Sequence, residues 1–195
     1  IALAENISGS EEDFAKLMNE YAKELGMDNS NFINSSGWPD PKHYSSMKDL
    51  AILSKAIIND FPKLYKIYKE KKFTYNNIMQ LNRNSLLKYY PGVDGLKTGY
   101  VKDSGYGIIV SSLKDKRRII VAINGLESQK TRIEESEKLL NWAYRETKHY
   151  EILTKDQVMT STDVWLGKNS TVDLISPKSI IKTLTHEEKE NITIK

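Results

Sequence analysis

One short stretch of this sequence carries side chains that suit an anionic ligand. It runs from Asp94 to Tyr100 and contains the triplet Lys97-Thr98-Gly99. Lys97 would supply a fixed cation and Thr98 a hydroxyl donor, a pairing that fits a carboxylate. Gly99 has no side chain, so a ligand backbone can lie close to a strand here, and an exposed strand edge can pair with an extended peptide. These residue types favour a site for a peptide that bears a carboxylate. Taken alone, the triplet is more typical of an ordinary strand start than of a binding site.

The composition excludes several other kinds of site. The 195 residues hold 29 Lys+Arg against 26 Asp+Glu, a net charge of +3, with 39% hydrophobic residues. This is a globular composition, long enough for the core of one or two domains, and its charge surplus gives no support to a nucleic-acid partner. The chain has no cysteine and only three separated histidines. We therefore expect no disulfide, no metal site and no cofactor.

The elements around the triplet can be predicted from capping residues and apolar spacing. Ser10 followed by acidic residues predicts a helix that ends at Gly26, and Ser46 predicts a second helix with Pro62 at its end or break. Residues 27–44 read as a loop. Residues 127–145 return to helical spacing, with four core candidates: Ile133, Leu139, Leu140 and Trp142.

Strand patterns surround the triplet and return near the end of the chain. One strand is predicted near Phe73–Tyr75, and three successive strands are predicted at Leu96–Tyr100, Tyr106–Ser112 and Arg118–Asn124, the last two joined by a charged hairpin. Beyond residue 150, short alternating pieces predict a small all-β module: Val158-Met159, Val164-Trp165-Leu166, Val172-Asp173-Leu174 and Ile180-Ile181. We place a domain boundary near residue 150. No apolar run reaches the ~18–20 residues of a membrane span.

The sequence resembles the serine D-alanyl-D-alanine carboxypeptidases, the low-molecular-mass penicillin-binding proteins, along nearly its whole length. The matching pieces include Ala2-Leu3-Ala4-Glu5, Leu25-Gly26-Met27, Tyr44-Ser45, Asn82-Arg83-Asn84, Asp94-Gly95-Leu96-Lys97-Thr98-Gly99, Gly105-Tyr106 and Leu139-Leu140-Asn141-Trp142. The resemblance implies an α/β (α+β) fold with a β-lactamase/transpeptidase-like antiparallel sheet and helices. Residues 1–150 would be the C-terminal portion of the catalytic domain, and 151–195 the start of a β-rich domain.

The same resemblance implies a serine-type hydrolase of the cell wall. In this family a serine in Ser-x-x-Lys attacks the peptide bond between two D-alanines, and water then hydrolyses the acyl-enzyme. A second motif, Ser-x-Asn, and a third, Lys-Thr-Gly, complete the site. The implied partners are a peptidoglycan stem peptide ending in D-Ala-D-Ala and, as inhibitors, β-lactams. The implied location is the periplasm or another extracytoplasmic site, with membrane association through a segment absent from this chain, which shows no signal peptide.

Carried over residue by residue, the resemblance assigns roles around the triplet. Lys97 would hold the electrostatics around a Ser–Lys pair, and Thr98 would bind the substrate carboxylate. The backbone N–H of Tyr100 would form one arm of an oxyanion hole. Arg83 and Arg132 match positions that line the site, and the forked guanidinium of Arg132 suits the terminal carboxylate. The plain alternative for both arginines is a surface ion pair.

The sequence departs from the family pattern in its nucleophile motifs. It contains no Ser-x-Asn, and it begins at Ile1, which looks like a cut start. Ser-x-x-Lys occurs at Ser45–Lys48, in a helix start, and at Ser111–Lys114, leading into a hairpin, and we interpret both as structural. We therefore expect the chain to be catalytically incomplete by itself.

Two other functions compete with the carboxypeptidase reading. A non-catalytic module would bind muropeptide or a β-lactam through the Lys97 strand without acylation. A β-lactamase shares Lys-Thr-Gly, but the β-rich tail argues against it, because we expect a β-lactamase to end with the helix after the last strand.

Overall fold

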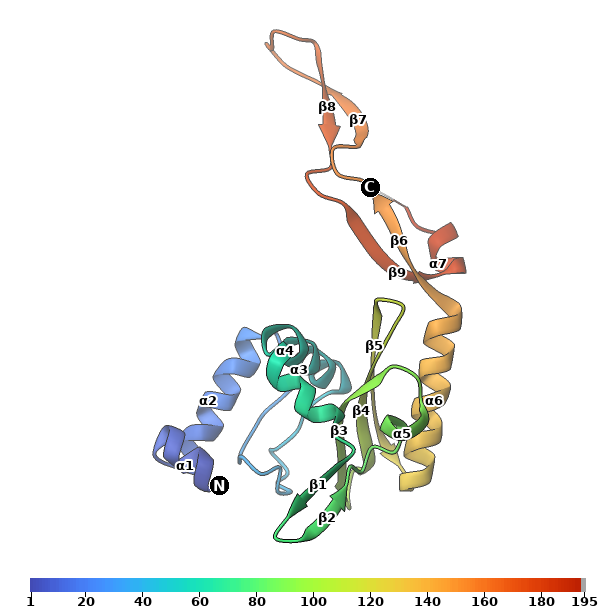
Figure 1. Ribbon diagram of the computed structural model, residues 1–195. Coiled ribbons are helices and arrows are strands. Elements are labelled where there is room, and N and C mark those ends of the chain that lie inside the picture. Colours follow the sequence, from blue (N-terminus) through green and yellow to red (C-terminus); the bar gives the residue numbers. More distant parts are fainter. Residues whose placement is uncertain (194–195) are drawn as a thin grey trace. The chain divides into compact units, whose positions relative to one another are not determined.

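The computed structural model of the protein describes residues 1–193. They form two compact units, of which the first is Ile1–Leu140 and the second begins at Asn141. The division falls within helix α6 (Gln129–Glu146), which Figure 1 shows beside a three-stranded sheet. Both units combine helices with antiparallel strands only, as expected from the sequence.

The first unit begins with helices whose N-termini are capped as predicted. The Ser10 hydroxyl accepts a hydrogen bond from the Asp13 N–H at 3.0 Å, and the Ser46 hydroxyl accepts one from the Asp49 N–H at 3.1 Å. Each cap satisfies a helix N–H that lacks a partner within the helix. The elements are α1 (Ala2–Ser8), α2 (Glu11–Glu24), α3 (Met47–Asp60), α4 (Pro62–Tyr65) and the 3-10 helix η1 (Lys66–Lys69).

The predicted run of three strands forms the central sheet. It consists of β3 (Val93–Val101), β4 (Gly105–Lys114) and β5 (Arg117–Leu126), in the order β3-β4-β5. The β4–β5 hairpin turns through Asp115 and Lys116, whose φ angles of 50° and 62° give the left-handed turn that twisted strands favour. Strand β3, which carries the Lys97 triplet, lies at one edge of this sheet.

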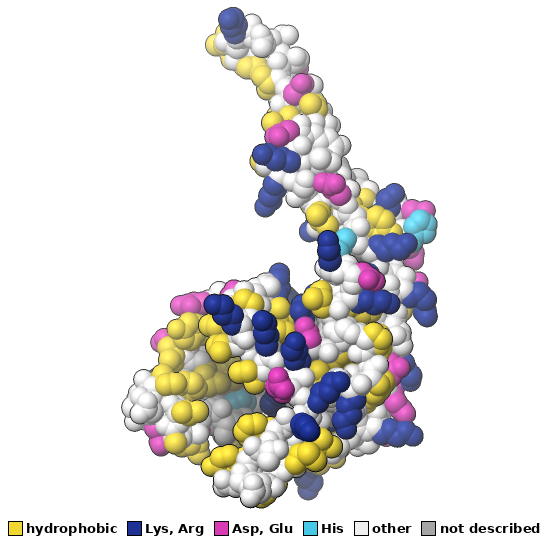
Figure 2. Space-filling view, viewed as in Figure 1, with side chains coloured by type: hydrophobic (Ala, Val, Ile, Leu, Met, Phe, Trp, Pro, Cys, Tyr) yellow, Lys and Arg dark blue, Asp and Glu magenta, His cyan; other side chains and the backbone are white. Residues whose placement is uncertain are grey.

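The segment between η1 and β3 contains more structure than the sequence indicated. The predicted strand near Phe73 is present as β1 (Lys72–Tyr75), and a second strand that was not predicted, β2 (Ile78–Leu81), pairs with it. A short helix, α5 (Leu86–Tyr89), follows. Every side chain of β1 and β2 is exposed, and Figure 2 shows the apolar ones on the surface at this hairpin.

The prediction that four residues of α6 lie in the core is wrong for two of them. Leu140 is fully buried, but Leu139 and Trp142 are exposed. The buried stripe of α6 instead runs through Arg132, Ser136 and Leu140, spaced four residues apart. The spacing of apolar residues does not predict this buried stripe, because two of its three residues are polar.

The second unit contains two antiparallel strand pairs, in which three of the predicted strand pieces lie, together with a strand, β6 (Thr147–Leu153), and a short helix, α7 (His186–Glu190), that were not predicted. Strand β6 pairs with β9 (Ile180–Thr185), and β7 (Val158–Asp163) pairs with β8 (Thr171–Ile175). The predicted strand piece at Val164–Leu166 is wrong. Those residues form the turn between β7 and β8, and Trp165 and Leu166 are almost fully exposed.

Among residues 1–193, no helix combines the length and the apolar character needed to cross a bilayer. The same residues contain no group of three or more histidine, aspartate or glutamate side chains arranged to hold a metal ion.

Candidate functional site

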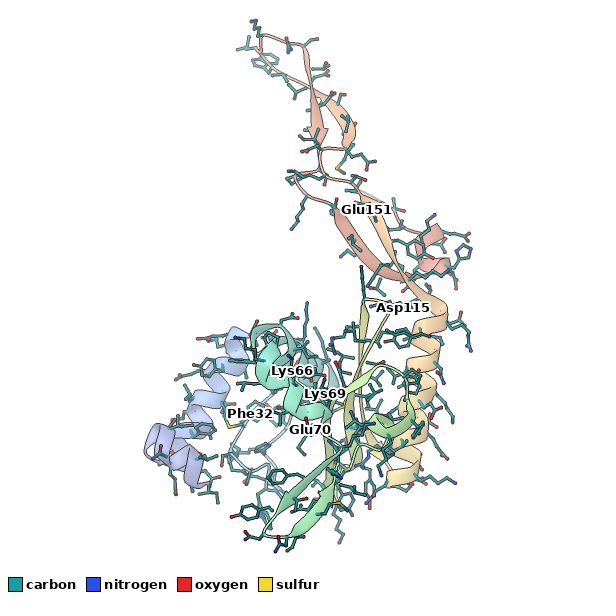
Figure 3. All side chains as sticks on the ribbon, in the orientation of Figure 1. Phe32, Lys66, Lys69, Glu70, Asp115 and Glu151 are labelled. Atoms are coloured by element: carbon teal, nitrogen blue, oxygen red, sulfur yellow. The ribbon has the colours of Figure 1, made fainter. Side chains whose placement is uncertain are left out.

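The edge strand β3 borders an open hollow of about 470 Å³ in the first unit. Residues 97–101 of β3 form one side of it, and side chains from the segment between α2 and α3 form another (Figure 3 labels one of them, Phe32). Most of the surface that lines the hollow is apolar. The segment between α2 and α3, together with α3, contributes six lining residues: Phe32, His43, Tyr44, Ser45, Met47 and Leu50.

Lys97 lies on the hollow in a locally positive environment. Its ammonium donates to the Thr98 carbonyl at 2.5 Å. Partial burial of the ammonium, together with the charges of Arg83 and Arg132, lowers the pKa of Lys97. Within the described part of the chain, none of these three cations forms an ion pair with a carboxylate. The predicted site cations are therefore brought together by the fold, and their charge is left uncompensated.

Arg132 is fixed rather than free on the surface. Its side chain is 3% exposed, and one guanidinium nitrogen donates to the Gly99 carbonyl at 3.3 Å. The guanidinium also lies 5.7 Å from the ring centroid of Tyr106, whose ring is 4.4 Å from that of Tyr100. Burial, and further the charge of Arg83, lowers the pKa of Arg132. Its Nε has no protein partner. A surface ion pair, the plain alternative, does not describe this residue.

Arg83 is exposed, but its backbone is anchored by the asparagines on either side. The Asn82 amide donates to the Glu70 carbonyl at 3.0 Å, and the buried Asn84 amide donates to the Gly95 carbonyl at 3.0 Å. The second of these bonds ties the arginine's segment directly to β3. The Asn-Arg-Asn sequence thus places an exposed cation on an anchored backbone beside the Lys97 strand.

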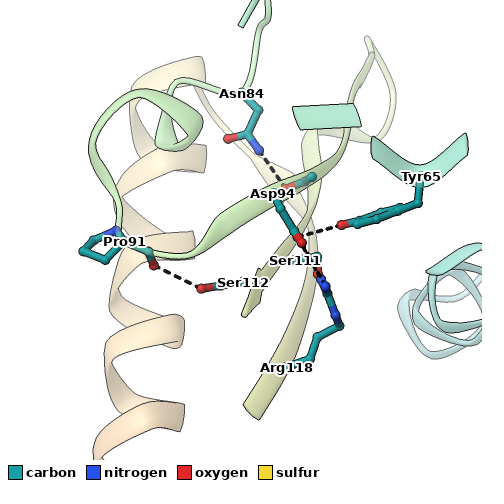
Figure 4. Close-up of polar contacts among 8 residues, drawn as sticks. Tyr65, Asn84, Pro91, Asp94, Ser111, Ser112 and Arg118 are labelled. Atoms are coloured by element: carbon teal, nitrogen blue, oxygen red, sulfur yellow. Dashed lines mark hydrogen bonds and ion pairs between the residues drawn. The ribbon is translucent and has the colours of Figure 1, made fainter. Parts of the chain in front are cut away.

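An ion-pair network that was not predicted lies at the start of β3 (Figure 4). The Asp94 carboxylate accepts two hydrogen bonds of 2.8 Å from the Arg118 guanidinium and one of 2.8 Å from the Tyr65 hydroxyl. Arg118 also donates to the Ser111 hydroxyl at 2.5 Å. A bidentate pair of this kind fixes geometry as well as charge. The network therefore holds β3 in place three residues before Lys97.

The sequence offered only a weak signal for this network. Asp94 interrupts an otherwise apolar strand start, but its partner is 24 residues away and no local spacing joins them. Gly95 is explained by the same packing, because a Cβ there would lie 2.5 Å from the Tyr65 hydroxyl oxygen. The absence of a side chain at Gly95 lets the tyrosine reach Asp94.

The network makes a prediction about alkaline stability. Burial, and then the bond to Asp94, raises the pKa of Tyr65 from 10.0 to about 12. Above the unfolded pKa the unfolded chain loses this proton first, so stability should fall by roughly 2 kcal/mol as the pH rises from about 10 to about 12. Urea unfolding of the chain and of Tyr65→Phe at several alkaline pH values measures this. The unsubstituted chain should show the steeper loss, and equal slopes would contradict the prediction.

The two Ser-x-x-Lys matches weighed from the sequence lack the geometry of a Ser–Lys pair. The Ser45 hydroxyl is hydrogen-bonded to that of Ser30 at 2.7 Å, while Lys48 is exposed. Ser111 is fully buried and accepts from Arg118. In the part of the chain that the structure describes, neither serine hydroxyl is hydrogen-bonded to the lysine of its own Ser-x-x-Lys sequence.

Ser-x-x-Lys also occurs at two further places that were not considered above, Ser85–Lys88 and Ser179–Lys182. Ser85 precedes α5, and Lys88 is exposed on that helix. Ser179 lies in the second unit, where its hydroxyl accepts from the Lys155 N–H at 3.1 Å. The Lys88 N–H donates to the Ser85 carbonyl at 3.0 Å, but within the part of the chain that the structure describes no side-chain hydrogen bond joins serine to lysine in either pair.

Two family models match this sequence. The model described as D-alanyl-D-alanine carboxypeptidase matches residues 1–127, and that described as the C-terminal domain of penicillin-binding protein 5 matches residues 148–195. Among individual relatives, D-alanyl-D-alanine carboxypeptidase DacC of Escherichia coli (strain K12) is 38% identical over 193 residues, which are 98% of this chain and 48% of the relative. The chain spans about half the length of the curated relatives it matches.

Solved structures of penicillin-binding proteins resemble most of this chain. Penicillin-binding protein 5 from Haemophilus influenzae superimposes with a TM-score of 0.83 at 36% identity, covering 97% of this chain and 56% of that one. Penicillin-binding protein D2 from Listeria monocytogenes, in its ampicillin-bound form, gives a TM-score of 0.68 at 29% identity, covering 73% of this chain and 60% of that one. The expected transpeptidase-like fold, with a β-rich part after it, is confirmed.

Proposed function

Since this chain belongs to the D-alanyl-D-alanine carboxypeptidase family, we propose that it supplies the Lys-Thr-Gly edge of a site that removes the terminal D-alanine from peptidoglycan stem peptides. The observation that carries this proposal is the cluster of Lys97, Arg83 and Arg132 at the edge of β3, three cations with no carboxylate partner among residues 1–193. A terminal carboxylate would neutralise that charge, and forked arginine contacts suit it.

In the proposed reaction a serine oxygen, supplied by a Ser-x-x-Lys motif, attacks the carbonyl carbon between the two D-alanines. The amide bond breaks, the terminal D-alanine leaves with a proton on its nitrogen, and an acyl-enzyme forms. Water then hydrolyses the ester and restores the serine. Lys97 would stabilise charge near the nucleophile, Thr98 and Arg132 would bind the carboxylate, and the Tyr100 N–H would donate to the oxyanion.

We also propose that this chain is catalytically incomplete by itself. It has no Ser-x-Asn, and its Ser-x-x-Lys serines are buried, bonded elsewhere or away from β3. In this proposal, residues 1–150 are the C-terminal portion of the catalytic domain and 151–195 the start of a β-rich domain, acting outside the cytoplasm in association with the membrane.

Labelling with a fluorescent penicillin tests both parts of the proposal. We expect no covalent label on the 195-residue chain, and a label on a longer form that carries Ser-x-x-Lys and Ser-x-Asn. Labelling of the short chain would contradict its incompleteness. A longer form that stays unlabelled would overturn the carboxypeptidase proposal.

Gly99→Ala separates ligand binding from folding. A Cβ at Gly99 would meet no protein atom within 4 Å, so the free energy of unfolding should change by less than about 0.5 kcal/mol. The added methyl would instead displace a ligand backbone lying on β3, and penicillin labelling of the longer form should slow by about tenfold or more. Gly95→Ala is the matched control for an effect on folding. Its added Cβ would collide with the Tyr65 side chain, so this variant should lower the free energy of unfolding, which Gly99→Ala should not. Unchanged labelling of Gly99→Ala would count against a ligand on this strand.

A second candidate function is non-covalent binding of muropeptide or β-lactam by this chain alone. It is supported by the same cation cluster, which needs no nucleophile to hold a carboxylate. Equilibrium dialysis with a penicillin distinguishes the two: saturable binding without a covalent label supports the binding module. A β-lactamase remains the least favoured reading, because strands β6 to β9 follow the last helix of the first unit.

A further inference from the structure

The segment between α2 and α3 contains a loop, residues 31–44, that is held rigidly at its base. Backbone hydrogen bonds of 2.8 and 3.0 Å join Asn31 and Tyr44. Beside this bridge the Asn19 side chain both accepts from the Phe32 N–H at 2.8 Å and donates to the Phe32 carbonyl at 2.7 Å. Phe32 and Tyr44, at the two ends of the 31–44 loop, line the hollow that Lys97 borders. The base of the loop is therefore part of the site.

At the apex of the 31–44 loop a tryptophan is presented to solvent on a fixed backbone. The Asn34 side-chain oxygen accepts from the N–H groups of Gly37 and Trp38 at 2.8 and 2.9 Å, and its amide donates to the Trp38 carbonyl at 2.9 Å. Gly37 has the left-handed φ of 76° that the turn requires. Trp38 is 75% exposed, and no ring contact involves it within residues 1–193. Three hydrogen bonds thus fix the backbone that carries a large, mostly exposed apolar side chain.

We propose that Trp38 is a specificity-determining residue whose indole packs against the stem-peptide residues preceding the two terminal D-alanines. The inference rests on the proposed function, in which Lys97 and Arg132 hold the terminal carboxylate and the peptide pairs with β3. Because Phe32 and Tyr44, at the base of the 31–44 loop, line the hollow, we expect a longer peptide anchored there to pass this loop. A tryptophan with a fixed backbone gives such a peptide a large apolar contact at low cost in conformational entropy.

The test uses the 195-residue chain with Trp142→Phe and Trp165→Phe, so that Trp38 is the sole source of indole fluorescence. The ligands are a pentapeptide ending in D-Ala-D-Ala, an acetylated D-Ala-D-Ala dipeptide and an N-acetylglucosamine oligomer. We expect the pentapeptide alone to shift the Trp38 emission. In the otherwise unsubstituted chain, Trp38→Ala should raise the pentapeptide Kd roughly five- to tenfold and leave the dipeptide Kd unchanged. Trp38→Phe should restore most of the affinity.

Trp165→Ala is the matched control, because Trp165 is 89% exposed in the second unit and should affect neither Kd. If Trp38→Ala changes both peptide Kd values equally, or neither, the inference is overturned while peptide binding stands. A response of Trp38 to the sugar oligomer alone would assign the tryptophan to glycan instead and would also overturn it. If neither peptide binds the unsubstituted chain, the inference about Trp38 is overturned together with the peptide site of this chain. Penicillin labelling of the longer form does not involve Trp38 and tests the proposed function separately.

Discussion

Replacing Lys97 by alanine should slow acylation of the longer form by penicillin about a hundredfold or more. Lys97 is the cation of the Lys-Thr-Gly edge, and neighbouring Arg83 and Arg132 add to a positive field with no carboxylate to offset it among residues 1–193. Removing one such preorganised charge commonly costs this much in rate. The measurement is the second-order rate constant for labelling. Lys102→Ala is the control, because Lys102 is exposed in the turn after β3 and should leave the rate unchanged.

The pH dependence of the same rate offers a sharper check on Lys97. Partial burial, and then repulsion from Arg83 and Arg132, lowers the pKa of Lys97, so Lys97 loses its proton at a lower pH than an ordinary lysine. Arg83→Gln should therefore raise the pKa of Lys97. The pH at which the labelling rate constant falls on the alkaline side should then be higher, even if the maximum rate constant also changes. An alkaline limb that stays in place, or moves to lower pH, would show that the three cations are not coupled.

The second large effect is on stability, at the Asp94–Arg118 pair. Asp94→Ala would leave the Arg118 guanidinium, which is 24% exposed, without its carboxylate, and the Tyr65 hydroxyl without its acceptor. Breaking such a pair from one side should lower the free energy of unfolding by about 3 kcal/mol. Urea unfolding at neutral pH measures the loss. Replacing both partners by apolar residues, Asp94→Leu with Arg118→Met, should cost less than the two single changes added together.

A surface pair provides the control for this result. Lys138 and Glu135 lie 2.6 Å apart, closer than Arg118 and Asp94, but their side chains are 70% and 39% exposed. Water and salt screen such a pair, so Glu135→Ala should change the free energy of unfolding by about 0.5 kcal/mol or less. If Asp94→Ala costs no more than Glu135→Ala, the network at β3 is not a structural anchor.

Local sequence features specified much of this fold. The helix starts at Ser10 and Ser46 follow from side chains that bond to an N–H three residues away, and the β4–β5 hairpin follows from a short polar turn between apolar strands. The same kind of local signal failed at Trp165 and Leu166. Their apolar character favours a strand, but Leu166 has a left-handed φ of 56°, and the pair forms a turn.

The sequence by itself determined the strand that bears Lys97-Thr98-Gly99, the two strands that follow it and the helices capped by Ser10 and Ser46, because those depend on contacts between residues a few positions apart. Only the tertiary structure decided which distant side chains meet there. Arg132 reaches the carbonyl of Gly99 across 33 residues, and Arg118 reaches Asp94 across 24. Such pairings arise when a helix and a sheet pack together, and their energy depends on burial and the field of neighbouring charges, which no spacing along the chain encodes.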